Sequence, residues 1–136
     1  MLVILCDGSS LGNPGPSSCA IIVWDRTKGS NQRKVKPTYK ERKELGVMTN
    51  NEAEWAALLM ALAYALKKST AETIYIYSDS MIVVNQANNV WTPKHQNMQK
   101  CYAEFMKIRV KRFTKDQLKI QWVPRQLVYL ADKHAR

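Results

Sequence analysis

The stretch DGSSLGNPGP, residues 7–16, follows a short apolar run that opens the chain and that ends in a carboxylate. The apolar run is typical of a buried strand, and the three glycines and two prolines of the stretch are typical of turns. Together they predict a strand over residues 1–7, ending at Asp7, and then a turn. The continuous apolar run SCAIIVWD, residues 18–25, predicts a second, centrally placed strand.

The rest of the chain alternates between helical and strand-like patterns. Residues 26–38 contain turn-forming residues and predict a loop, whereas residues 39–47 fit an edge strand by position and a helix by composition. Apolar residues at three- and four-residue steps predict a helix over 50–68. Beyond it we expect a strand over 73–77, a short helix over 80–88, a loop over 89–97, a helix over 98–113, a strand over 117–123 and a short helix over 127–135.

This order of elements predicts one α/β domain over residues 1–136 with a mixed sheet. The first three strands would form an antiparallel meander, and helical crossovers would connect the later ones. No apolar run approaches the ~20 residues that span a bilayer, and the opening MLVIL is too short for a signal peptide. The three cysteines show no CxxC spacing and fit buried thiols in a reducing compartment. We therefore expect a cytoplasmic protein.

The charge balance points to a polyanionic partner. Lysine and arginine total 21 against 11 acidic residues, which gives a net charge of +10. A basic surface raises the local concentration of polyanions, above all nucleic acids. Many solvated surfaces are basic as well, so the charge carries weight only together with the acidic residues that stand in apolar contexts.

Four acidic residues stand out by position: Asp7, Glu54, Asp79 and Asp132. Asp7 and Asp79 end predicted strands, and Glu54 and Asp132 lie in predicted helices. Sites in α/β sheets gather at strand ends, so the four carboxylates could converge. Each also has a structural interpretation: Asp7 and Asp79 as turn or helix caps, Glu54 as a helix-dipole partner and Asp132 as a surface charge. Spacing alone does not decide between them.

Converged carboxylates repel one another and call for a cation. Oxygen ligands in a chain with only two histidines suit Mg²⁺ or Mn²⁺ rather than zinc. Two such ions about 4 Å apart can clamp the attacking water and the leaving oxygen of a phosphodiester. A basic chain with an acidic metal site would then hold a nucleic acid by its backbone and cut it.

Four motifs, in order, resemble type I ribonuclease H in its compact bacterial and archaeal-like form: DGSSLGNPGP, TNNEAEWAAL, YSDSMIVVNQ and WVPRQLVYLADKHA. The resemblance covers essentially the whole chain. It implies the ribonuclease H-like fold, a five-stranded mixed sheet of order 3-2-1-4-5 with helices on both faces. It also implies a two-metal-ion endoribonuclease that hydrolyses the RNA strand of RNA/DNA hybrids, leaving 5′-phosphate and 3′-hydroxyl ends. We expect it to act as a monomer.

The resemblance assigns roles to the four acids. Asp7, Glu54, Asp79 and Asp132 match the family's catalytic, metal-binding carboxylates, with Asp7 bridging two Mg²⁺ ions for which Mn²⁺ can substitute. The resemblance also explains why a predicted strand ends in a carboxylate, because Asp7 would hold metal at the crevice of the sheet.

The resemblance also implies a substrate-binding set. Asn13, Gly15, Asn50 and Asn51 would contact RNA 2′-hydroxyls, which distinguish RNA from DNA. Thr49 matches a family threonine in a phosphate pocket for the DNA strand.

His95 and Arg125 complete the substrate-binding set that the resemblance implies. His95 stands where the family often has asparagine, and it would contact a DNA phosphate. Arg125 occupies the VPR position and would assist product release. Val128 replaces a common asparagine, which puts a hydrogen bond near Asp132 in doubt.

Two rival hypotheses remain from the sequence. One is a module that binds hybrids or double-stranded RNA with weakened catalysis, which the changes at His95 and Val128 keep open. The other is a different enzyme of the same fold, such as an integrase or a Holliday-junction nuclease. That second rival lacks the combined GNPGP and TNNxAE signatures.

Overall fold

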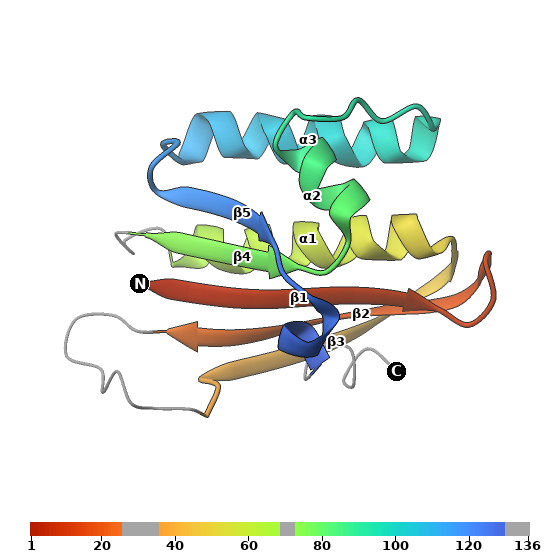
Figure 1. Ribbon diagram of the computed structural model, residues 1–136, viewed down its shortest axis with the longest axis horizontal. Helices are drawn as coiled ribbons and strands as arrows, with labels where there is room; N and C mark the ends of the chain where they lie inside the picture. The colour runs from red at the N-terminus through yellow and green to blue at the C-terminus, as the bar shows by residue number, and fades with distance from the viewer. Residues whose placement is uncertain (26–35, 69–72, 130–136) are drawn as a thin grey trace.

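A computed structural model describes residues 1–25, 36–68 and 73–129, and its centre is one five-stranded sheet of order β3-β2-β1-β4-β5 (Figure 1). β1, β2 and β3 are antiparallel neighbours, and β4 runs parallel to both β1 and β5. The predicted sheet and its strand order are confirmed. The strands are β1 (Leu2–Ser10), β2 (Gly15–Asp25), β3 (Tyr39–Met48), β4 (Ile74–Ser78) and β5 (Leu118–Trp122).

Two strand predictions are refined by the pairing. The ladder between β1 and β2 continues past Asp7 to the pair Ser10↔Ser17, so the turn is shorter than the glycines and prolines suggested. Residues 39–48, ambiguous by composition, form edge strand β3 because their backbone pairs with β2. The side chains of β3 are mostly exposed, as expected of an edge strand, and pairing overrides the weak local preference.

Three α-helices within the described residues lie along one side of the sheet (Figure 1). On the other side the described chain places the 3-10 helix η1, whose Val128 packs against Leu5 and Ile22. Of the helix predicted over 127–135, the structure describes residues 127–129, which are helical, and residues 130–136 lie outside the described residues. The helices are α1 (Asn50–Lys67), α2 (Met81–Ala87), α3 (Gln96–Arg112) and η1 (Arg125–Val128).

The main core lies between the sheet and the helices. Alternate residues of β1 enter it, among them Leu2, Ile4 and Cys6, as the period of two in a strand requires. Trp55 of α1 and Phe105 of α3 are fully buried and meet edge to face, with ring centroids 5.7 Å apart. Burying side chains of this size contributes about 2 kcal/mol each, which fixes α1 and α3 relative to the sheet.

Candidate active site

Three carboxylates from separate elements meet at one end of the sheet. Asp7 lies on β1, Glu54 in the first turns of α1, and Asp79 directly after β4. One carboxylate oxygen from each lies within 4.8 Å of the other two. β1 and β4 are parallel neighbours whose pairing runs to Leu5↔Tyr77, so Asp7 and Asp79, each two residues further on, lie side by side where β4 ends. The structure thus brings together three of the four acids singled out by sequence, and Asp132 lies outside the described residues.

Glycine at position 8 allows β1 and α1 to approach closely enough for this. A Cβ at Gly8 would lie 2.1 Å from the backbone oxygen of Ala53 and 2.6 Å from the backbone nitrogen of Glu54. Contacts that short do not occur, so any other residue would push the strand and helix apart. The close approach also lets the Gly8 N–H donate to Glu54 Oε1 at 2.9 Å.

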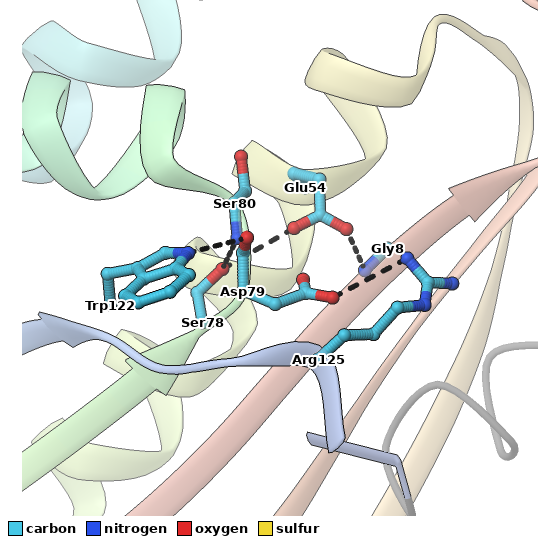
Figure 2. A network of polar contacts seen from close by, with 7 residues as sticks. All are labelled: Gly8, Glu54, Ser78, Asp79, Ser80, Trp122 and Arg125. Atoms are coloured by element: carbon cyan, nitrogen blue, oxygen red, sulfur yellow. Dashed lines mark hydrogen bonds and ion pairs between the residues drawn. The ribbon is translucent and has the colours of Figure 1, made fainter. Parts of the chain in front are cut away.

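A second donor orients the other oxygen of Glu54 (Figure 2). The hydroxyl of Ser78, at the end of β4, donates to Glu54 Oε2 at 3.4 Å and accepts a hydrogen bond from the Ser80 N–H at 3.1 Å. Ser80 in turn caps α2 by accepting from the Val83 N–H. Glu54 is therefore held from both neighbouring strands, and Ser78 is a positioning residue that the sequence reasoning missed.

Asp79 is contacted by Trp122 of β5 and by Arg125 in the segment after β5 (Figure 2). The indole Nε1 of Trp122 donates to the backbone oxygen of Asp79 at 3.0 Å. Arg125 Nη1 lies 3.5 Å from Asp79 Oδ2. The sequence reasoning connected neither residue to Asp79, because no spacing rule links residues more than forty positions apart.

Holding three carboxylates close together in a largely buried cluster costs free energy, because the charges are desolvated and repel one another when no cation is bound. Asp7 is 1% exposed and Glu54 9% exposed. Desolvation raises the pKa of Glu54 to about 7, and the charge of Asp79 adds to the rise, while hydrogen bonds from Asp7, Gly8 and Ser78 oppose it. A divalent cation would offset the repulsion, and a donor set made only of carboxylate oxygens fits Mg²⁺ or Mn²⁺.

Glu54 and Asp79 line an open cavity of about 400 Å³, whereas Asp7 is buried and does not line it. The lining combines these two acids with backbone and polar groups from the β1–β2 turn and from the start of α1. The lining residues are Gly8, Ser9, Ser10, Leu11, Asn50, Glu54, Asp79, Ser80 and Arg125.

Two of the predicted substrate residues join the β1–β2 turn to α1. Asn50 donates its backbone N–H to Asn13 Oδ1 at 3.0 Å, and Asn50 Oδ1 accepts from the Ser10 N–H at 3.1 Å. Gly15 is needed for the turn itself, since a Cβ there would lie 2.0 Å from the backbone oxygen of Leu11. These bonds orient the two asparagine amides at the rim of the cavity.

Thr49 and Glu52 start α1 with a capping box. The Thr49 hydroxyl accepts from the Glu52 N–H and the Glu52 carboxylate accepts from the Thr49 N–H, both at 3.2 Å. Asn97 lies in the first turn of α3, and its side chain donates to Glu52 Oε2 at 3.2 Å. The capping box therefore also joins the starts of α1 and α3.

A second groove, of about 620 Å³, lies beyond the start of α1. Asn51 and His95 line it together with Trp91, whose ring is 45% exposed. His95 precedes α3 and makes no side-chain cap bond. The predicted substrate residues thus divide between two concave surfaces, with Asn50 in the first and Asn51 in the second.

Val128, where the resembled family commonly has asparagine, is fully buried. It packs against Leu5 and Ile22 on the face of the sheet opposite α1. The apolar residue therefore has a packing role in this chain.

The sheet order, the position of the three helices and the acidic cluster beside the carboxyl end of β4 define an RNase H-like protein. The RNase H family model matches residues 1–125. The chain therefore belongs to the RNase H family.

Similar proteins include bacterial relatives and solved structures. The chain is 31% identical over 134 residues to the "Bifunctional protein Rv2228c" of Mycobacterium tuberculosis, covering 98% of this chain and 34% of that protein. It is 42% identical over 93 residues to "Ribonuclease HI" of Helicobacter pylori, covering 68% and 56%. The crystal structure of LC11-RNase H1 in complex with RNA/DNA hybrid superposes with a TM-score of 0.83 at 24% identity, covering 98% and 93%. The chain thus spans about a third of the length of the mycobacterial relative.

None of the helices in residues 1–25, 36–68 and 73–129 is long and apolar enough to cross a membrane.

Proposed function

We propose that this protein is a metal-dependent endoribonuclease that hydrolyses the RNA strand of RNA/DNA hybrids. The observation that carries the proposal is the convergence of Asp7, Glu54 and Asp79 within 4.8 Å, with Glu54 and Asp79 lining an open cavity, in a chain with a net charge of +10. Membership of the RNase H family supports it. We propose Asp132 as the fourth carboxylate of the same site.

The side chains of the cluster suit two Mg²⁺ ions, for which Mn²⁺ can substitute. When bound, such ions supply an activated water and stabilise the leaving oxygen of a phosphodiester, which leaves 5′-phosphate and 3′-hydroxyl ends. The chain's own part is to hold the ligands in place. Gly8 and Ser78 orient the two oxygens of Glu54, and Trp122 fixes the backbone of Asp79.

The two concave surfaces suit a double-stranded substrate. The cavity that holds the acids would take the RNA strand, with Asn13, Gly15 and Asn50 near its 2′-hydroxyls. The groove with Asn51, His95 and Trp91 would take the DNA strand.

We assign Thr49 and His95 to DNA phosphates and Arg125 to the mouth of the RNA cavity. Asn51 lines the second groove, and we assign it with Asn50 to RNA 2′-hydroxyls. An aromatic ring as exposed as Trp91 can stack on a sugar or base. We propose that a single domain acts as a monomer.

The test is cleavage of a labelled RNA strand presented alone, paired with RNA and paired with DNA, each with Mg²⁺, Mn²⁺ or EDTA. We expect cutting confined to the hybrid, abolished by EDTA and reduced by at least a hundred-fold in Asp7→Asn and Asp79→Asn, as loss of a group that stabilises transition-state charge costs. Asp116→Asn, which removes a carboxylate that lines neither concave surface, is the matched control.

Intact binding without cleavage in the two variants would support an enzyme. Tight, salt-sensitive binding of the hybrid by the wild-type protein, with no cutting under either metal, would instead support a hybrid-binding module.

A further inference from the structure

Arg125 covers one of the three carboxylates of the acidic cluster. Its guanidinium approaches Asp79 Oδ2 at 3.5 Å from the mouth of the cavity (Figure 2). The Asp79 side chain is only 10% exposed, whereas the Arg125 side chain is 58% exposed. Ions from solvent would therefore reach Asp79 past the long, half-exposed side chain of Arg125.

The backbone around Arg125 is anchored on both sides. Before it, the Val123 N–H donates to the backbone oxygen of Ser78 at 3.0 Å, and the Trp122 indole N–H donates to the backbone oxygen of Asp79. After it, the Leu127 N–H donates to the Pro124 oxygen at 3.0 Å, and Val128 is fully buried. The arginine side chain can therefore change partners while its backbone stays in place.

We propose that Arg125 is an exchangeable counter-ion of the metal site. It pairs with Asp79 while the cluster holds no metal, and it gives up Asp79 when a divalent cation binds, which turns the guanidinium toward the phosphate of the substrate. This inference rests on the proposed function, because it assigns the metal to the cluster of Asp7, Glu54 and Asp79.

Charge and geometry favour the exchange. A guanidinium and a divalent cation that share one carboxylate repel each other. The divalent cation binds the carboxylate more strongly and therefore displaces the guanidinium. The 3.5 Å pair is weak on the arginine side, because water screens the 58% exposed guanidinium and the long side chain loses entropy in holding the contact. Once released, the planar guanidinium matches the oxygens of a phosphate in bidentate geometry, which a lysine would not reproduce.

If Arg125 competes with the metal for Asp79, removal of its guanidinium should strengthen metal binding. Mg²⁺ and Mn²⁺ binding to the intact chain, without substrate, is measured by isothermal titration calorimetry. Arg125→Gln should bind each ion about two- to five-fold more tightly, the range that an exposed ion pair represents. Arg125→Lys keeps a cation and should stay closer to wild type.

The matched control is Arg112→Gln, which makes the same change in net charge at the exposed end of α3, away from both cavities. Its metal affinity should equal that of wild type. Thermal unfolding gives a second readout. Arg125→Gln should have a lower Tm than wild type in EDTA, and the deficit should shrink or reverse at saturating Mg²⁺, since tighter binding to the native state adds stability.

Two outcomes overturn the proposal, and they separate it from the proposed function. If wild type binds Mg²⁺ and Mn²⁺, and Arg125→Gln binds them equally or more weakly with the same Tm deficit in both conditions, the exchange is wrong while the metal site stands. If wild type binds neither ion, and Asp79→Asn changes nothing, both the exchange and the metal-dependent function fail.

Discussion

Glu54 is the residue whose ionisation links the site to pH. Burial raises its pKa from 4.5 to about 7 in the metal-free protein, so the folded state holds a proton there that the unfolded chain releases at lower pH. Stability falls with rising pH wherever the folded state binds more protons. The metal-free protein should therefore lose stability as the pH rises between 4.5 and about 7.

The measurement is chemical unfolding in EDTA across that pH interval. Glu54→Gln should flatten the loss of stability with pH, whereas Glu104→Gln, which removes an exposed carboxylate on α3, should leave it unchanged. In wild type, Mg²⁺ affinity should rise over the same interval, because the metal competes with the proton on Glu54. An affinity independent of pH would contradict this account.

At the scale of elements, the site depends on how closely β1 approaches α1. Gly8→Ala should destabilise the fold by about 3 kcal/mol, the upper part of the usual range for overpacking, because the new Cβ meets rigid backbone of Ala53. It should also weaken Mg²⁺ binding, since the strand carries Asp7 and the donor to Glu54.

Gly46→Ala is the matched control for that substitution. Gly46 lies on β3 with a φ of +77°, and nothing stands within 4 Å of the position of its Cβ. Only backbone strain should then arise, at a cost of about 1 kcal/mol. Urea unfolding and metal titration compare the two variants. Equal destabilisation, or intact metal binding in Gly8→Ala, would show that the approach of β1 to α1 does not build the site.

At the scale of the whole molecule, an acidic site lies in a strongly basic protein. The net charge of +10 should dominate the affinity for a nucleic acid, while the buried carboxylates contribute to chemistry. Affinity for an RNA/DNA hybrid, measured in EDTA by fluorescence anisotropy, should fall about forty-fold or more between roughly 50 and 200 mM salt, as expected for three or more phosphate contacts.

Asp7→Asn is the comparison for the salt experiment. It should leave the slope of affinity against salt unchanged, because the residue is buried and contacts no phosphate in the metal-free state. A hybrid affinity that hardly varies with salt would instead place recognition in uncharged contacts.

Much of the architecture was predictable from the chain itself. Continuous apolar runs identify β1 and β2, which are buried on both faces, and apolar residues at three- and four-residue steps identify α1, because burial on one face imposes a period of 3.6 on a helix. The short motifs around Asp7, Glu54 and Asp79 indicate the family, and with it the order of the sheet. These signals are local, so a linear sequence carries them in full.

The tertiary structure decided what depends on contacts between distant segments. Pairing with β2 makes residues 39–48 a strand, and packing against α1 explains the glycine at position 8. The partners that hold the acids, among them Ser78, Trp122 and Arg125, reach the cluster from separate elements. Convergence of the carboxylates within 4.8 Å follows from the parallel pairing of β1 with β4 and the start of α1 at the same edge. No local spacing encodes that convergence, because it arises only when the elements pack together.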